Sequence, residues 1–158
     1  MIVAAVLTVS DRSAAGIRED AAGPVAVAAL REAGFACADA VIIADGADLV
    51  ERSLRQLVDA GIRLIVTSGG TGVAPRDQTP EGTVRVIERQ LPGIAEELRR
   101  SGAAVKPAAM LTRGIAGVTG RALIVNLPGS PKAVAEGMPI VLSVARHVLD
   151  QLDGEDHR

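Results

Sequence analysis

Residues 62–81 read IRLIVTSGGTGVAPRDQTPE, a short apolar run that leads directly into a loop dense in glycine, proline and charged residues. The run at 62–68 is rich in β-branched residues and is bounded by glycine on both sides, which is typical of a buried strand. At the other end, Thr79-Pro80 is a hydroxyl residue followed by proline, the pattern of a helix N-cap and first helical residue. The stretch therefore predicts a strand, a glycine-rich loop and a helix in direct succession.

The same succession recurs along the chain. Four more short apolar runs indicate strands, at 2–9, 38–43, 114–120 and 121–127. Apolar residues at helical spacing predict helices ending before Gly34 and before Gly61, and further helices at 80–90, 92–101 and 131–152. Strands that alternate with helices predict an α/β fold, a three-layer αβα sandwich around a mostly parallel sheet. The two runs within 114–127 are so close together that they predict one antiparallel hairpin or edge strand.

The composition is that of one globular domain. A chain of 158 residues suits a single domain, which we place at 1–152 with a frayed tail at 153–158. Phe35 is the only aromatic residue and the net charge is −2, which argues against base stacking and against a basic nucleic-acid footprint. No apolar run approaches the roughly 20 residues that span a bilayer. With one cysteine and no signal-like N-terminus, the sequence predicts a cytoplasmic protein that binds neither nucleic acid nor membrane.

Three loops that follow predicted strands are rich in glycine and polar residues. They are SDRSAAGIREDAAGP at 10–24, SGGTGVAPRDQTPE at 68–81 and NLPGSPKA at 126–133. In an open α/β sheet, ligands gather where the strands end and the following helices begin. Glycines permit close backbone approach, and the start of a helix attracts anions, so these loops are suited to a phosphate. One such loop would be explained equally well as a simple turn, but three at the same edge of the sheet favour a ligand.

Two familiar nucleotide signatures are absent. Neither of the two lysines follows a glycine, which excludes the P-loop pattern. Gly69-Gly70-Thr71-Gly72 does not continue as a dinucleotide fingerprint, because Pro75 stands where the last glycine would be. A phosphate would have to be held in another way. Lys132 is a candidate, since a lysine in the first turn of a helix opposes the helix dipole unless an anion lies nearby. The alternative is a solvated surface lysine.

The carboxylates of the same loops suggest a hard metal ion. Asp48 and Glu51 fit a capping box at the start of the second long helix, which leaves Asp45 without a capping role. Asp77 stands before the predicted Thr79 cap and is not needed to start a helix. Two carboxylates of this kind could hold Mg²⁺, whose other ligands are water and substrate phosphates. The alternative for each is an Asx-turn or a solvated charge. Asp11 is a third candidate with the same ambiguity.

Three motifs together give a family resemblance. LTVSDRSAAGIREDAAGP, TSGGTGVAPRDQTPE and NLPGSPKAV occur in an order that resembles the MogA/MoaB family of molybdenum cofactor biosynthesis, which includes the G domain of gephyrin-type proteins. The resemblance runs from about residue 2 to residue 150. It implies a three-layer domain that forms a homotrimer or hexamer and binds molybdopterin. In the active branch, the pterin phosphate attacks the α-phosphate of Mg-ATP, giving adenylylated molybdopterin and pyrophosphate.

The resemblance also implies roles for individual residues. The catalytic, metal-holding acids correspond to Asp45 and Asp77, and Mg²⁺ would arrive with ATP as co-substrate, with no permanently bound cofactor. A MoeA-like metal-insertion protein is the expected partner. The alternatives are a non-catalytic oligomeric pterin carrier and a nucleotide hydrolase related to competence-damage proteins. The substrate-binding candidates, including neighbouring loop residues that we add, are Ser10, Asp11, Ser68, Gly69, Gly70, Thr71, Gly72, Pro128, Gly129, Ser130 and Lys132.

Overall fold

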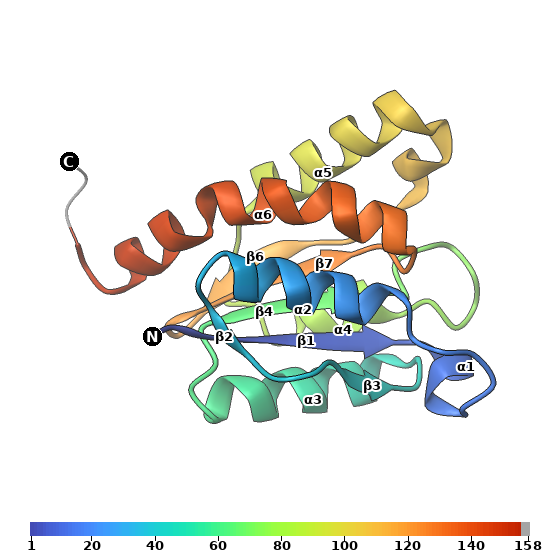
Figure 1. The fold of residues 1–158 in the computed structure, drawn as a ribbon, viewed down its shortest axis with the longest axis horizontal. Helices are drawn as coiled ribbons and strands as arrows, with labels where there is room; N and C mark the ends of the chain where they lie inside the picture. Colours follow the sequence, from blue (N-terminus) through green and yellow to red (C-terminus); the bar gives the residue numbers. More distant parts are fainter. Residues whose placement is uncertain (156–158) are drawn as a thin grey trace.

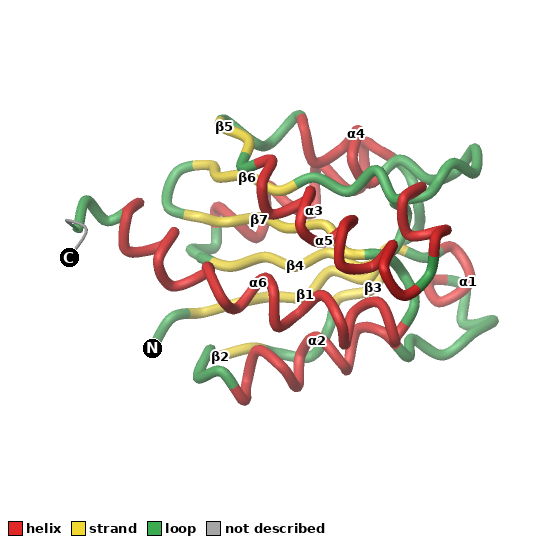
Figure 2. Tube along the Cα trace, turned by 90° about the horizontal axis from the view of Figure 1, so that it is seen from above, coloured by secondary structure: helices red, strands yellow, loops and turns green. Residues whose placement is uncertain are grey.

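The computed structural model describes residues 1–155, and a seven-stranded sheet forms its centre. Six strands lie side by side in the order β2-β1-β4-β7-β6-β5, and β3 extends β2 along the same edge of β1 (Figure 2). Strands β1, β2, β3, β4 and β7 pair in parallel, whereas β5 and β6 pair antiparallel. The strand bounds are Val3–Val9 (β1), Ala36–Cys37 (β2), Val41–Ile43 (β3), Leu64–Ser68 (β4), Arg89–Gln90 (β5), Ala116–Thr119 (β6) and Ala122–Leu127 (β7).

Helices cover both faces of this sheet, so the prediction of a three-layer α/β fold is confirmed. Helices α2, α5 and α6 lie on one face and α3 on the other, with α4 packed against α3 (Figure 1). The short helix α1 and the 3-10 helix η1 lie at the ends of the layers. The helix bounds are Asp11–Ala14 (α1), Ala22–Glu32 (α2), Ala47–Asp59 (α3), Thr79–Val84 (α4), Pro92–Val105 (α5), Pro107–Leu111 (η1) and Pro131–Leu152 (α6).

The alternation of side chains along the central strands creates two hydrophobic cores. Leu64 and Val66 of β4 face the α2 and α6 side, whereas Ile65 between them faces α3. All three side chains are fully buried. Burying a side chain of this size contributes about 2 kcal/mol, so the β-branched and leucine-rich runs are the main source of stability. The central strands are continuous apolar runs because both of their faces are covered.

Two predicted elements are shorter than expected. Of the run at 38–43, only Val41–Ile43 (β3) is a strand, and the preceding part of the β1 edge pairs with β2, which lies before that run. The helix predicted at 80–90 ends at Val84, and Arg89–Gln90 instead pairs with β6. Gly117 makes this pairing possible, because a β-carbon there would lie 2.5 Å from the Arg89 carbonyl oxygen. The hairpin at 114–127 and the helix at 131–152 are confirmed.

The capping box predicted for α3 is wrong. The helix begins at Ala47, so Asp48 and Glu51 lie inside it, and their carboxylates form ion pairs with Arg85. The Ala47 amide at the start of the helix donates to the side-chain oxygen of Gln78, 3.1 Å away. A residue 31 positions later in the chain therefore satisfies this end of α3, which no local pattern could indicate.

The helix start predicted at Thr79 also differs in detail. Thr79 is itself the first residue of α4, and Gln78 occupies the N-cap position without a side-chain capping bond. The Thr79 hydroxyl is fully buried and donates to the Gly69 carbonyl, 2.9 Å away, because the loop folds back on itself. The second predicted cap is confirmed, since the Ser130 hydroxyl accepts from the Ala133 amide.

Asp153, the first residue of the tail predicted to fray, lies at the end of α6. Its carboxylate forms ion pairs with Arg63 and Arg121, with nitrogen–oxygen distances of 2.9 and 2.6 Å. Residues 156–158 of that tail lie outside the described residues, and its fraying stays a prediction. Across residues 1–155, no helix is both long enough and apolar enough to cross a bilayer.

Candidate functional site

A cavity of about 1170 Å³ lies where β1, β4 and β7 end and their loops begin. It collects residues from segments far apart in sequence, and every site residue that the sequence predicted lines it. Residues of α5, η1 and α6 form a further part of its wall. The predicted residues that line the cavity are Ser10, Asp11, Asp45, Ser68, Gly69, Gly70, Thr71, Gly72, Asp77, Pro128, Gly129, Ser130 and Lys132.

The loops after β1 and β3 are locked together by Asp11 and Asp45. The Asp11 amide donates to the Asp45 carboxylate at 2.9 Å, and the Asp45 amide donates back to the Asp11 carboxylate at 3.1 Å. Arg76 forms two hydrogen bonds with the Asp11 carboxylate and a third with the Asp45 carbonyl oxygen. The Arg76 guanidinium holds the pKa of Asp11 below its ordinary value. Asp11 is therefore engaged in joining three loops.

Asp45 and Asp77 lie against the glycine loop from two directions. A β-carbon on Gly70 would lie 3.1 Å from a carboxylate oxygen of Asp45, and one on Gly72 would lie 2.8 Å from a carboxylate oxygen of Asp77. Burial raises the pKa of Asp45, and neighbouring negative charges, that of Asp77 among them, raise it further. The charge of Asp77 is thus close enough to Asp45 to disfavour the ionised form of Asp45.

Close backbone approach explains two glycines of the glycine cradle, which consists of the loops at 68–72 and 128–130. Gly69 has a φ of +101°, and a β-carbon there would overlap the Val9 carbonyl oxygen. A β-carbon on Gly129 would lie 3.3 Å from the Gly69 α-carbon, so the loops after β4 and β7 touch. The buried Ser68 hydroxyl donates to the Pro128 carbonyl oxygen and joins the same two loops. Ser68 therefore helps to shape the cradle.

The start of α6 completes the cavity wall. Ser130 caps this 22-residue helix, Pro131 is its first residue and Lys132 is exposed in its first turn. A long helix places partial positive charge at its N-terminus, and a lysine beside it adds a full one. This end of the cavity is suited to an anion, while the acidic pair, Asp45 and Asp77, lies against the glycine loop.

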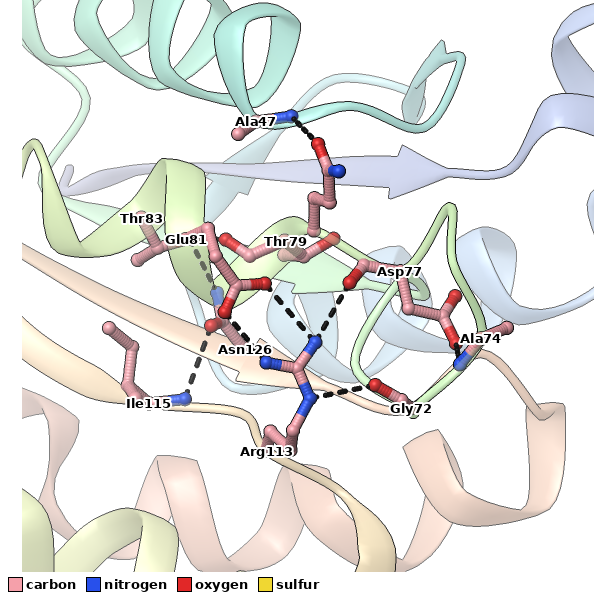
Figure 3. A network of polar contacts seen from close by, with 11 residues as sticks. Ala47, Gly72, Ala74, Asp77, Thr79, Glu81, Thr83, Arg113, Ile115 and Asn126 are labelled. Atoms are coloured by element: carbon pink, nitrogen blue, oxygen red, sulfur yellow. Dashed lines mark hydrogen bonds and ion pairs between the residues drawn. The ribbon is translucent and has the colours of Figure 1, made fainter.

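The sequence did not predict the role of Arg113 and Glu81. Figure 3 shows the Arg113 guanidinium between Glu81 of α4 and the loop that carries Asp77. Arg113 stands in the triplet Thr-Arg-Gly before β6 and Glu81 follows Thr79-Pro80, but neither belongs to a periodic pattern. No local sequence signal indicates that the two residues pair, because they are 32 positions apart.

Comparison with known proteins agrees with this geometry. Residues 5–147 match the family described as a probable molybdopterin binding domain. Molybdopterin adenylyltransferase of Helicobacter pylori is 39% identical over 152 residues, which cover 94% of this chain and 86% of that protein.

Two solved structures share the fold at high similarity. The Mog protein of Mycobacterium ulcerans has a TM-score of 0.91 and 41% identity, covering 96% of this chain and 99% of that one. The molybdopterin biosynthesis enzyme MoaB of Thermus thermophilus has a TM-score of 0.90 and 41% identity, and 100% of both chains is covered. With these matches, and with the three motifs gathered around one cavity, the chain belongs to the MogA/MoaB family of molybdenum cofactor biosynthesis proteins.

Proposed function

We propose that this protein is a molybdopterin adenylyltransferase that uses Mg-ATP to adenylylate the terminal phosphate of molybdopterin. The observation that carries the proposal is the meeting of Asp45 and Asp77, from separate loops, with the glycine cradle and the α6 N-terminus in one cavity. The name of the Helicobacter pylori relative supports the reaction. The proposal includes a cytoplasmic homotrimer or hexamer that delivers its product to a MoeA-like metal-insertion protein.

The reaction needs alignment more than it needs a protein nucleophile. An oxygen of the pterin phosphate forms a bond to the α-phosphorus of ATP, and the bond from that phosphorus to the α–β bridging oxygen breaks. The electron pair leaves with pyrophosphate, so AMP is joined to the pterin phosphate. Transfers of this type depend on positioning the two phosphates and on neutralising their charge. The cradle and the acidic pair are suited to these two tasks.

The acidic pair has the chemistry expected of a Mg²⁺ site. Asp45 and Asp77 are two hard oxygen donors that face one cavity, and the raised pKa of Asp45 shows that burial and nearby negative charge oppose its ionised form. A divalent cation would relieve that opposition. Mg²⁺ commonly takes one or two protein carboxylates and completes its octahedron with water and phosphates. When bound, the ion would neutralise charge on the ATP phosphates.

The remaining wall residues would hold the two substrates. The glycine loop after β4, the capped start of α6 and Lys132 are suited to phosphate groups. Leu98, Leu111 and other apolar residues of α5 and η1 provide a surface for a flat organic ring. Pockets for one drug-sized ligand usually measure about 300–1000 Å³, and this cavity, at about 1170 Å³, exceeds that range.

The proposal is tested by incubating the protein with molybdopterin and Mg-ATP and measuring adenylylated pterin and pyrophosphate. We expect product from the unaltered protein and a loss of about 100-fold or more in Asp45→Asn and Asp77→Asn. Asp39→Asn is the matched control, because that carboxylate is 97% exposed and does not line the cavity.

Three other outcomes would overturn the proposal or its residue roles. Pterin binding without product would support a carrier, and ATP breakdown without pterin would support a hydrolase. Full activity in both aspartate variants would show that these carboxylates are not the catalytic pair.

A further inference from the structure

We propose that Arg113 is a positioning residue that fixes Asp77 for cation binding by tying both ends of the loop at 72–77 to α4. This inference rests on the proposed function. Arg113 lies in the segment before β6 and does not line the cavity, so it acts through the loop and not on the substrates.

The loop that carries Asp77 has little support from secondary structure. Residues 69–78 form neither helix nor strand, and Val73 and Ala74 are exposed. Within the loop, the Asp77 amide donates to the Ala74 carbonyl oxygen and the Ala74 amide donates to the Asp77 carboxylate. These two bonds close a small turn, but they fix its shape and not its place against the sheet. Arg76 ties the middle of the loop to Asp11 and Asp45, and the position of the Asp77 carboxylate depends as well on contacts made by the two ends of the loop.

Arg113 makes contacts at both ends. Its Nε donates to the Gly72 carbonyl oxygen and its Nη2 to the Asp77 carbonyl oxygen, each at 2.8 Å (Figure 3). Nη1 and Nη2 donate to the Glu81 carboxylate at 2.6 and 3.1 Å. Four hydrogen bonds from one rigid, planar group determine the spacing between two carbonyls and a helix. The Arg113 amide also donates to the Thr71 carbonyl oxygen, so its own backbone is anchored to the start of the loop.

Glu81 explains how Arg113 can hold Asp77 without neutralising it. The guanidinium contacts the backbone carbonyl of Asp77, whereas its ion pair is with Glu81. That pairing lowers the pKa of Glu81 and raises that of Arg113, so both stay charged. The positive charge is thus balanced by a carboxylate outside the acidic pair. The Asp77 carboxylate itself accepts from the Ala74 amide.

The arrangement is better suited to positioning than to stability. The side chains of Arg113 and Glu81 are 37% and 45% exposed, and ion pairs with this exposure contribute little to the free energy of unfolding. Loss of the hydrogen bonds made by the forked Arg113 guanidinium would free the loop at 72–77 while leaving the two hydrophobic cores intact. A substitution of Arg113 should therefore change loop mobility and cation affinity more than melting temperature.

The test compares Arg113→Lys with a matched arginine elsewhere. Lysine keeps the charge but offers one ammonium group in place of a fork, so it cannot span the same acceptors. Arg63→Lys is the control, because Arg63 also binds two carbonyls and one carboxylate, those of Arg121, Leu149 and Asp153, far from the cavity. Each variant is measured for Tm, for amide hydrogen exchange at 73–78 without ligands, and for adenylyl transfer over a range of Mg²⁺ concentration.

We expect Arg113→Lys to exchange the loop amides about tenfold faster, to lower kcat about tenfold or more, and to require more Mg²⁺. Arg63→Lys should leave loop exchange and the Mg²⁺ requirement unchanged. Glu81→Gln separates the two roles of the network: the loop should stay protected, while the Mg²⁺ requirement rises because the guanidinium charge is no longer balanced.

Two results would overturn the inference. Unchanged loop exchange and an unchanged Mg²⁺ requirement in Arg113→Lys would show that the fork does not position Asp77. Equal losses of activity in the two lysine variants, in proportion to their loss of Tm, would show a merely structural role. If the unaltered protein makes no adenylylated pterin, the proposed function fails, and the exchange measurement still decides whether Arg113 holds the loop.

Discussion

Replacing Gly70 by alanine should destabilise the protein through two separate effects. Gly70 has a φ of +68°, and a residue with a β-carbon in this left-handed conformation costs about 1–2 kcal/mol. The added methyl group would also overlap the Thr79 hydroxyl, which is fully buried and donates to Gly69. Displacing that hydroxyl breaks a buried hydrogen bond, at about 1–3 kcal/mol. The expected loss is therefore about 2–5 kcal/mol, or roughly 4–20 °C in Tm for a chain of this size.

Gly16→Ala is the control that separates the two effects. Gly16 has a φ of +73°, and a β-carbon there would meet no heavy atom of the described residues within 4 Å. It should therefore lose only the backbone term, about 1–2 kcal/mol. The assay is chemical denaturation followed by circular dichroism, with Tm as a second measure. Equal losses in the two variants would refute the argument that the Gly70 site lacks space, and would leave backbone conformation as the whole reason for glycine.

Three further substitutions test the surroundings of the cavity. Burial raises the pKa of Asp45 in the folded protein above 3.8, so folding favours the protonated form of this carboxyl. The contribution of Asp45 to stability is therefore fully present below its unfolded-state pKa and is lost as the pH rises through its folded-state pKa. Asp45→Asn should therefore have a higher Tm than the unaltered protein at pH 7, and melting curves should show this difference vanish below about pH 4. Asn126→Leu should cost about 2–3 kcal/mol in urea denaturation, because it leaves the Ile115 amide without its buried acceptor. Gly82→Ala should cost about 1–3 kcal/mol in the same assay, since its β-carbon would lie 2.5 Å from the Ala47 carbonyl oxygen.

The parts of the fold that the sequence predicted are those governed by local burial. The run at 62–68 reads as a strand because four of its seven side chains are apolar and it lies between two glycines, and Leu64–Ser68 is indeed covered on both faces. The Ser130-Pro131 cap was predictable for another reason, since its donor and acceptor lie only three residues apart. The proximity of Asp45 and Asp77 could be predicted from the sequence, because parallel strands end at a common edge of the sheet.

The parts that could not be predicted depend on partners distant in sequence. Gln78 satisfies the start of α3 in place of the local Asp48 because the glycine loop folds across that helix. The contact of Glu81 with Arg113 joins positions 32 apart, and neither residue shows a periodicity that would reveal it. A single chain gives no signal for such pairs, because any of its many surface charges could satisfy the same chemistry.

The interlocking of the loops also explains how the fold can hold a carboxylate in an unfavourable place. Asp45 and Asp11 each donate a backbone amide to the carboxylate of the other. Arg76, from the loop after β4, also donates to the Asp45 carbonyl oxygen. These bonds cannot form unless the strands below are in register, and that register is determined by the buried core. The packing of the sheet therefore offsets the free-energy cost of holding the Asp45 carboxylate where its pKa is raised. Because a bound cation would remove much of that cost, substrate and metal should stabilise the protein more than their contact area alone would suggest.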